Sequence, residues 1–272
     1  MANLILVTGG TGTVGRVVVR HLLDAGRQVR VLSRGRRRTG PTQHVTGDVR
    51  TGEGLVEAVA GVDTIVACVD PVHRVVEAAL RAGKPHLAYI SIVGVDRVPL
   101  GYYRRKLADE RLIAASGLPW TVLRTTQFHD LVAVLLRLLA KPPVLMVPAG
   151  WSFQPVDVRE VGARLAALAL SEAAGRVPDL AGPEVRTVED LARTYLTAVG
   201  KRRRIVPVPL PGRVCRAYRA GGHLAPDRAA GTIGFEQCLG QQLAAGTVPY
   251  EDAIPSTNVF RGSRWTLPTA ST

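Results

Sequence analysis

A short apolar run near the N-terminus breaks into glycines and then continues as a second apolar run. Residues 4–15 read LILVTGGTGTVG, and VVVRHLLDAG follows from residue 17. This order is typical of a buried strand, a tight turn and the start of a helix, where free backbone N–H groups and the positive end of the helix dipole meet. The sequence therefore predicts a binding place for a pyrophosphate.

The spacing of the glycines supports this prediction. Gly10, Gly12 and Gly15 satisfy the pattern G-x-G-x-x-G, and Gly9, Gly12 and Gly15 satisfy the variant G-x-x-G-x-x-G. Missing side chains allow the backbone to approach phosphates and the helix to pack closely on the strand. A strand before and a helix after are the context that the pattern requires. The residues expected to contact a dinucleotide here are Gly9, Thr11, Gly12, Thr13, Val14 and Gly15.

The second expected strand, 28–33, indicates which dinucleotide is bound. Units that bind NAD carry an acidic residue about 20 positions after the glycines, bonded to the adenosine ribose. No carboxylate occurs between residues 28 and 47 of this chain. The strand ends instead in Ser33 and then in RGRRR, residues 34–38.

Arginine at this strand tip favours a phosphorylated ribose. A guanidinium clamps a 2′-phosphate through paired, charge-assisted hydrogen bonds, whereas a carboxylate repels it. We therefore predict NADPH rather than NADH, with Ser33 and Arg34 in contact and Arg36 or Arg37 in support. A solvated basic loop at 36–38 is the alternative that stays open.

Composition limits the other partners. The 272 residues suffice for one sizeable core, and the formal net charge of +13 raises the question of nucleic acid. However, 31 of the 35 basic residues are arginines, scattered along the chain, and aromatic residues are sparse. A platform that stacks bases needs interleaved aromatic side chains. We therefore expect a small-molecule substrate and no nucleic acid.

Cysteine and histidine usage points to a reduced protein without a metal. Cys68, Cys215 and Cys238 form no CxxC pair, and the six histidines are dispersed. The N-terminus lacks the pattern of a signal peptide, and the most apolar segment, 131–140, is too short to span a bilayer. We expect a cytoplasmic protein without a membrane span, as a monomer or a homodimer.

Strands and helices are expected in strict alternation. The expected strands after the first are 28–33, 44–46, 63–67, 86–91 and 120–124, and the expected helices after the first are 54–60, 72–82 and 103–116. Such alternation with short links predicts an α/β fold with a doubly wound parallel sheet of the Rossmann type. Ligands of these sheets bind at the carboxyl ends of the strands.

The rhythm changes beyond residue 126. Further elements are expected at 130–140, 144–147, 158–170 and 188–199, with Asp157 and Thr187 as the N-caps of the last two. We expect three parts. They are a dinucleotide-binding core over 1–126, a smaller C-terminal substrate lobe over 127–240, and a loosely ordered tail over 241–272.

Tyr102 and Lys106 stand four residues apart at the start of the helix expected around 103–116. They therefore share one face of that helix. Free tyrosine titrates near pH 10, and an ammonium ion within about 4–6 Å lowers such a pKa by about 1–3 units. We expect Tyr102 to give a proton to a carbonyl that receives hydride. Lys106 would lower the pKa of Tyr102 and hold the ribose hydroxyls, and Ser91 would bond the substrate oxygen. Two alternatives stay open: Tyr103 faces the pocket instead, or Tyr102 only packs and Lys106 is solvated.

Several short segments together resemble one protein family. They are the turn at 8–15, GDV at 47–49, YISIVG at 89–94, Tyr102 with Lys106, GLPWTVLR at 117–124, TQFHD at 126–130 and QPVD at 154–157. Over residues 3 to about 240 the chain resembles an atypical short-chain dehydrogenase/reductase of the NmrA-like NAD(P)H-binding branch, of a type common in actinobacteria. By this resemblance Asp48 and Val49 contact the adenine, Ala67, Cys68 and Val69 line the ribose side, and Ile92 lies near the nicotinamide.

Two departures from the family pattern concern one link. The segment CVDP at 68–71 is several residues shorter than in similar proteins. It also lacks the asparagine or serine expected near the nicotinamide ribose. The resemblance therefore leaves the shape of this part of the pocket open.

The sequence thus predicts an NADPH-dependent reductase that transfers hydride to a carbonyl, enone or quinone-like apolar molecule. Phe128, Leu131, Leu135 and Trp151 are the expected apolar walls of the pocket. Two alternatives stay open because the family includes non-catalytic members: an NADP(H)-sensing regulatory protein, and a non-redox isomerase or dehydratase on the same scaffold.

Overall fold

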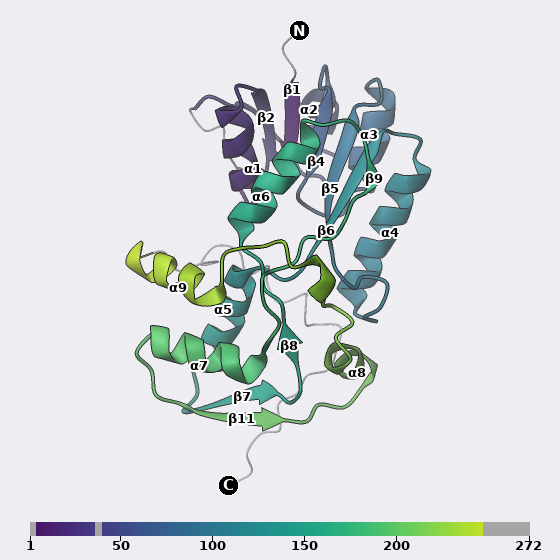
Figure 1. The fold of residues 1–272 in the computed structure, drawn as a ribbon. Coiled ribbons are helices and arrows are strands. Elements are labelled where there is room, and N and C mark those ends of the chain that lie inside the picture. Colours follow the sequence, from purple (N-terminus) through teal and green to yellow (C-terminus); the bar gives the residue numbers. More distant parts are fainter. Residues whose placement is uncertain (1–3, 36–39, 247–272) are drawn as a thin grey trace.

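A seven-stranded sheet forms the centre of the computed structural model, which describes residues 4–35 and 40–246 (Figure 1). Its strands are β1 (Leu4–Thr8), β2 (Gln28–Ser33), β3 (Gln43–Thr46), β4 (Thr64–Ala67), β5 (His86–Ile92), β6 (Trp120–Thr125) and β9 (Gly175–Arg176). They lie in the order β3-β2-β1-β4-β5-β6-β9, and every neighbouring pair is parallel. The first six follow the order 3-2-1-4-5-6 of dinucleotide-binding folds. The predicted doubly wound parallel sheet is confirmed.

Helices cover both faces of this sheet. They are α1 (Thr13–Asp24) and α6 (Val158–Ala169) on one face, and α2 (Leu55–Val59), α3 (His73–Arg81) and α4 (Gly101–Ala115) on the other. The alternation of side chains along β1 shows this directly. Leu4 and Leu6 pack with α2 and α3, whereas Ile5 and Val7 pack with α1 and α6. Because both faces are covered, the central strands β1 and β4 are buried along their whole length and are almost entirely apolar.

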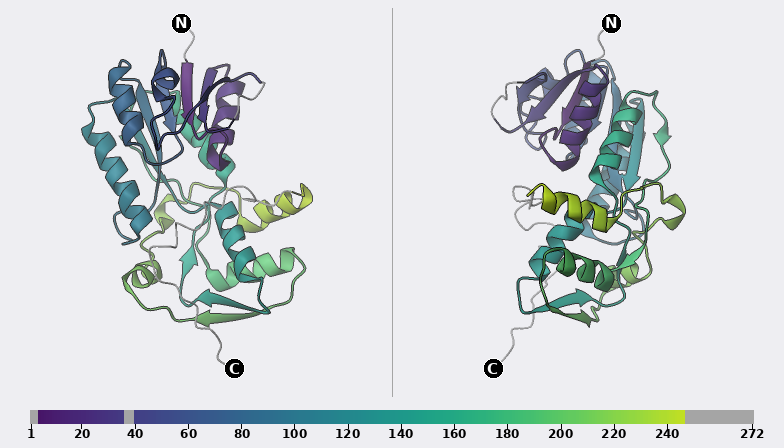
Figure 2. Two further views of the ribbon diagram at one scale, coloured as in Figure 1. Left: turned by 180° about the vertical axis from the view of Figure 1, so that it is seen from behind. Right: turned by 60° about the vertical axis from the view of Figure 1, so that its left-hand side comes forward.

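A smaller lobe lies beyond the carboxyl ends of the strands (Figures 1 and 2). Its elements are α5 (His129–Leu139), β7 (Val144–Pro148), β8 (Ser152–Phe153), β10 (Arg186–Thr187), α7 (Val188–Ala198), β11 (Arg204–Val208), α8 (Arg213–Arg219), the 3₁₀ turn Pro226–Arg228 and α9 (Phe235–Ala244). Strands β7 and β11 pair in parallel, and β8 and β10 pair antiparallel. A separate apolar cluster, which includes Leu145, Leu191 and Phe235, holds α5, α7 and α9 together.

The two lobes do not divide at residue 126 in a simple way. Helix α6 packs against α1, and β9 pairs with β6 as the edge strand of the sheet, although α6 and β9 lie in the range expected to form the small lobe. The division into domains stays a prediction, and this packing argues for assigning the stretch from 158 to 176 to the core. The tail expected from residue 241 begins inside α9, and residues 247–272 lie outside the described residues.

Both expected helix caps of this region are present. The Asp157 carboxylate accepts a hydrogen bond from the Arg159 backbone N–H, and the Thr187 hydroxyl accepts one from the N–H of Asp190. These bonds satisfy first-turn amides that have no partner within their own helix. The caps fix where α6 and α7 begin.

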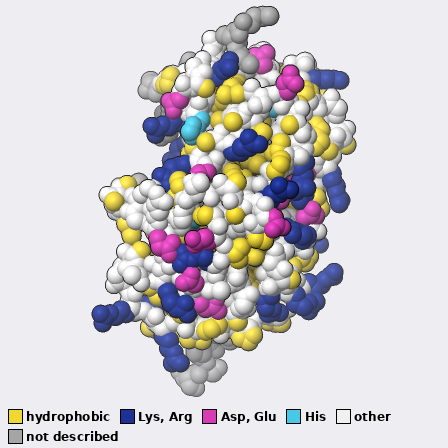
Figure 3. Space-filling model, viewed as in Figure 1, with side chains coloured by type: hydrophobic (Ala, Val, Ile, Leu, Met, Phe, Trp, Pro, Cys, Tyr) yellow, Lys and Arg dark blue, Asp and Glu magenta, His cyan; other side chains and the backbone are white. Residues whose placement is uncertain are grey.

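The surface carries its positive charge in a dispersed form. Figure 3 shows Lys and Arg spread over one face with Asp and Glu between them rather than in a continuous stripe. Within residues 4–35 and 40–246, no helix has the length and apolar character needed to cross a membrane. The absence of nucleic acid among the partners stays a prediction.

Candidate cofactor and substrate site

The turn between β1 and α1 presents unpaired amides at the carboxyl edge of the sheet. Gly9 adopts a positive φ of 71°, and the N–H of Gly12 donates to the Gly9 carbonyl at 2.9 Å. The first helical bond runs from Arg16 to Gly12, so the amides at 13–15 have no partner within the helix. No side chain caps α1, and its first turn holds no acidic residue. These features fit an anionic phosphate group.

Each glycine of this turn has its own steric reason. A Cβ at Gly15 would lie 2.1 Å from the Gly9 carbonyl oxygen, and one at Gly10 would lie 2.9 Å from a Val31 methyl group. A Cβ at Gly9 would meet Val69 at 2.4 Å. Gly12 is exposed, and a Cβ there would have only the Gly9 oxygen nearby, at 3.3 Å. Gly12 is therefore the open approach to the backbone, and the others allow close packing behind it.

The rim beside this turn holds the residues expected at the adenosine. Ser33 ends β2 with its hydroxyl 2.8 Å from His44 Nε2, and Arg34 follows it, exposed. Asp48 accepts the backbone N–H of Arg50 at 2.8 Å, while Val49 is buried. Arg36 and Arg37 lie outside the described residues. The structure thus brings Ser33 and Arg34 to the edge where β1 ends.

The end of β4 is the next part of this edge. Ala67 is fully buried, and the Cys68 N–H donates to the Thr8 carbonyl at 3.2 Å. Burial raises the pKa of the Cys68 thiol to about 12, although the nearby Lys106 ammonium opposes the change. The thiol is therefore protonated near neutral pH and is not a reactive thiolate.

Asp70, directly after these residues, connects β4 with α4. Its Oδ1 accepts the Tyr89 hydroxyl at 2.8 Å and lies 2.9 Å from Lys106 Nζ. Its Oδ2 accepts the Tyr102 hydroxyl at 3.3 Å. A second carboxylate, that of Asp109, also accepts the Tyr89 hydroxyl, at 3.3 Å. One carboxylate therefore holds three side chains at the strand ends.

The surroundings of Lys106 differ from those expected. The residue is 4% exposed, and its ammonium group donates to the Ile90 carbonyl at 2.8 Å and lies 4.5 Å from the centroid of the Tyr89 ring. Burial and the neighbouring Asp70 carboxylate raise the pKa of Tyr102 instead of lowering it. Asp70 and a backbone carbonyl hold the ammonium group, and the role expected for Lys106 at Tyr102 stays a prediction.

Ser91 lies on β5, the strand that pairs with β4. Its hydroxyl has no hydrogen-bond partner among the described residues. Its side chain is 1% exposed. The same holds for eight further buried side-chain atoms of the described residues, which include Thr8 Oγ1, Gln127 Oε1 and Trp151 Nε1. Buried polar groups without partners are rare in folded proteins, so they mark positions where a ligand or water completes the bonding.

Aromatic side chains of the small lobe pack with Tyr102 and Ile92. Trp151 stacks on Tyr218 with ring centroids 4.3 Å apart, and Phe153 contacts both rings. Trp151, Phe153, Tyr102 and Ile92 are partly exposed members of the same apolar cluster. Of the expected walls, Trp151 lies here, whereas Phe128 packs with the cluster of α1 and α6.

Tyr103 differs from its neighbour Tyr102. It is 4% exposed, and its hydroxyl accepts the Gln127 side-chain amide at 3.2 Å. The Tyr218 hydroxyl lies 3.4 Å away. Tyr102 rather than Tyr103 therefore shares a partner with Lys106.

Sequence reasoning gave Asp70 no role, and Tyr89 entered it only through the family resemblance. Asp70 is the first acidic residue after the strand expected over 63–67, at the edge of the sheet where ligands bind. It went unused because nothing in the local sequence indicates that this link folds back over Lys106.

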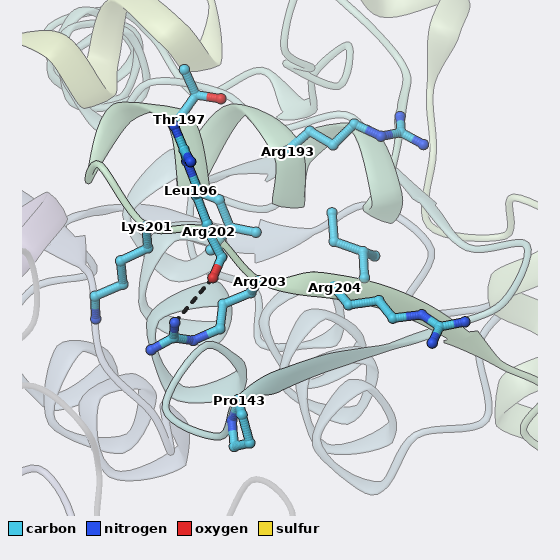
Figure 4. Close-up of a pocket in the computed structure, with 9 residues that line it drawn as sticks. Pro143, Arg193, Leu196, Thr197, Lys201, Arg202, Arg203 and Arg204 are labelled. Carbon is cyan, nitrogen blue, oxygen red and sulfur yellow. Dashed lines mark hydrogen bonds between the residues drawn. The ribbon is translucent and has the colours of Figure 1, made fainter.

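An open hollow of about 560 Å³ lies elsewhere, between the C-terminal end of α7 and the start of β11 (Figure 4). Its basic side chains are Arg193, Lys201, Arg202, Arg203 and Arg204, all exposed. Cations beside the last turn of a helix are favoured by its dipole. This surface needs no ligand to account for it. The described part of the chain holds no group of His, Cys, Asp and Glu that could bind a metal.

Comparison with known proteins agrees with the geometry. The profile of the NAD(P)H-binding family matches residues 9–142. A (4-alkanoyl-5-oxo-2,5-dihydrofuran-3-yl)methyl phosphate reductase from Streptomyces griseus is 33% identical over 220 residues, which are 73% of this chain and 74% of the relative. The chain belongs to this NAD(P)H-binding family of atypical short-chain dehydrogenase/reductases.

One further relative matches both in sequence and in structure. Quinone oxidoreductase 2 from Escherichia coli is 27% identical over 216 residues, which are 73% of this chain and 76% of that protein. The crystal structure of the NADPH-dependent quinone oxidoreductase from Escherichia coli in complex with NADPH matches with a TM-score of 0.73, 21% identity, and coverage of 88% of this chain and 99% of that one. Together with its likeness to these named reductases, membership of the family identifies this protein as an NAD(P)H-dependent oxidoreductase.

Proposed function

We propose that this oxidoreductase is an NADPH-dependent reductase of quinone-like, enone or carbonyl compounds. The observation that carries the proposal is the closeness of two features on one sheet edge. The glycine turn with its free amides ends β1, and Ser91, Tyr102 and Asp70 gather at the neighbouring ends of β4 and β5. Reductases of a furanone phosphate and of quinones among the relatives support the same reaction class.

The residues of the site have two tasks, to bind the cofactor and to hold the acceptor. The amides at 13–15 bind the pyrophosphate, and Arg34 binds the 2′-phosphate of the adenosine ribose. When bound, the nicotinamide supplies a hydride to the acceptor. Ser91 and Tyr102 then hold the acceptor oxygen through their hydroxyl groups. The 3.3 Å bond from Tyr102 to Asp70 is long for O–H···O, so this hydroxyl is easily turned toward a substrate.

Arg34→Ala is expected to weaken NADPH binding by about tenfold or more, because it removes a charge-assisted hydrogen bond to the 2′-phosphate. NADH binding should not change, since NADH has no such phosphate. Fluorescence titration with both nucleotides measures the two affinities. Arg27→Ala is the matched control, because Arg27 is an exposed arginine at the opposite end of β2. Equal binding of NADPH and NADH by the wild type would rule out the preference for NADPH.

Tyr102→Phe is expected to lower kcat for quinone reduction by about tenfold or more, because the oxygen that gains charge loses a hydrogen-bond donor. The NADPH affinity should stay within about twofold of the wild type. Stopped-flow oxidation of NADPH measures turnover, and Tyr103→Phe is the control with the same side-chain change outside the Asp70 contacts. A wild type that binds NADPH but oxidises none with any acceptor would favour a sensor. Product without net NADPH consumption would favour a non-redox enzyme.

A further inference from the structure

Asp70 places a negative charge where a proton-donating tyrosine would gain from a positive one. Its carboxylate accepts the Tyr102 hydroxyl at 3.3 Å and pairs with Lys106 Nζ at 2.9 Å. Lys106 also donates to the Ile90 carbonyl and is almost fully buried. The ammonium is therefore held by two acceptors, and neither of them is Tyr102.

We propose that Asp70 is a positioning residue that keeps the Tyr102 hydroxyl protonated and separates it from Lys106, and that it thereby restricts the site to quinones and enones. This inference rests on the proposed reductase function and narrows its acceptor. Saturated ketones and aldehydes are excluded as efficient substrates.

The first step of the argument concerns the acidity of Tyr102. Loss of its proton would create a phenolate beside the Asp70 carboxylate, and like charges disfavour the charged form. Burial raises the pKa of Tyr102 first, and Asp70 raises it further through its charge and its hydrogen bond. The groups that act on Tyr102 are Asp70 from the β4–α3 link, Tyr89 on β5, Tyr103 beside it and Arg105, whose guanidinium lies 5.8 Å from the ring centroid. Arg105 is exposed, so solvent screens its opposing effect.

The second step concerns which acceptors can be reduced when the proton donor of the site is a weak acid. Hydride addition, with the cofactor as the two-electron donor, leaves a hydroquinone monoanion from a quinone, an enolate from an enone and an alkoxide from a saturated ketone. Each anion must gain one proton to complete the product. The first two spread their charge over several atoms and can wait for a proton from water. An alkoxide carries its charge on one oxygen and needs a strong acid in the transition state.

The aromatic surroundings fit the same acceptors. Trp151 and Phe153 share the cluster of Tyr102 and Ile92, and the buried Trp151 Nε1 has no hydrogen-bond partner among the described residues. Flat, conjugated molecules stack on such rings, and one free N–H suits a carbonyl oxygen.

A direct titration of Tyr102 tests the inference without cofactor or acceptor. The ultraviolet absorbance of tyrosinate is followed with pH for the wild type and for Tyr102→Phe, and their difference reports Tyr102 alone. We expect no ionisation of Tyr102 up to about pH 11, above the ordinary tyrosine value of about 10. The same difference measured with Asp70→Asn should show ionisation at least about one pH unit lower than in the wild type.

Asp109→Asn is the matched control for this titration. Asp109 also accepts the Tyr89 hydroxyl but contacts neither Tyr102 nor Lys106 through a hydrogen bond. This variant should leave the titration of Tyr102 as in the wild type. Ionisation of wild-type Tyr102 at the ordinary tyrosine pKa, or an equal shift in Asp70→Asn and Asp109→Asn, would overturn the role of Asp70. An ordinary tyrosine pKa in the wild type overturns this role even where Asp70→Asn does not fold.

An acceptor panel tests the narrowed substrate class. NADPH oxidation is measured with a naphthoquinone, an α,β-unsaturated ketone and the corresponding saturated ketone. The wild type should turn over the first two at least about a hundredfold faster than the third, and Asp70→Asn should narrow this ratio by about tenfold. Comparable rates for all three in the wild type would refute the restriction. No turnover of any acceptor would refute the reductase function, while the titration would still decide on Asp70.

Discussion

Gly15→Ala is expected to reduce NADPH affinity by about a hundredfold or more, which corresponds to about 2.7 kcal/mol. A Cβ at this position would lie 2.1 Å from the Gly9 carbonyl oxygen, 2.7 Å from its carbon and 2.8 Å from the Gly10 Cα. All three are backbone atoms, so no side-chain rotation relieves the clash. Helix α1 must move away from the turn, and the amides at 13–15 then no longer converge on one phosphate. Fluorescence titration with NADPH measures the loss.

The control for this variant is Gly240→Ala. Gly240 lies in helix α9, where a Cβ would meet no atom within 4 Å. Alanine favours a helix over glycine by up to about 1 kcal/mol, so thermal stability should rise slightly and NADPH binding should not change. Gly15→Ala should in addition unfold at a lower temperature, since overpacking costs about 1–3 kcal/mol. Wild-type affinity in Gly15→Ala would show that the turn does not bind the pyrophosphate.

The parallel sheet was predictable because the sequence marks its central strands clearly. Residues 4–7 (LILV), for example, are continuously apolar, end in a glycine-rich turn and are followed by a helix pattern, so the hydrophobic pattern and the turn residues indicate the same element. The strand β11 was not predicted, because RIVPV carries an arginine and a proline within five residues. Its pairing with β7 stabilises it through a partner that is 60 residues away in sequence.

The packing of α6 on α1 was also missed, although one residue carries a signal for it. Gly162 interrupts an otherwise ordinary helix, and a Cβ there would lie 2.4 Å from a Val17 methyl group. Glycine inside a helix pattern often marks a close approach of another element. The signal says that something approaches closely, but it does not say what. Asp70 is a similar case, because its partners come from two other elements.

Glu110→Ala is expected to destabilise the protein by about 3 kcal/mol or more. Glu110 on α4 forms two hydrogen bonds with Arg124 on β6, of 2.9 Å from Nε and 2.6 Å from Nη2. The two side chains are 10% and 7% exposed. Alanine would leave the guanidinium buried with Asp96 as its remaining acidic partner in the described part of the chain. Urea unfolding at neutral pH measures the loss, and helix α4, which carries Tyr102, would be held less firmly.

Two further variants test whether the stability lost in Glu110→Ala comes from the buried charge of Arg124. Asp96→Ala removes the other acidic partner of Arg124. The Asp96 side chain is 47% exposed, so this variant should lose no more than about 1 kcal/mol of stability. Partial burial raises the pKa of Asp96, but the hydrogen bond and charge of Arg124 outweigh this and lower it. The stability that Asp96 contributes is therefore present above the ordinary pKa of about 3.9 and fades as the pH falls below that value.

The double variant Glu110→Met/Arg124→Met should recover most of the stability lost in Glu110→Ala, because it leaves no unpaired buried charge. If the double variant were as unstable as the single one, the shape of these two side chains rather than their charge would hold α4 on β6.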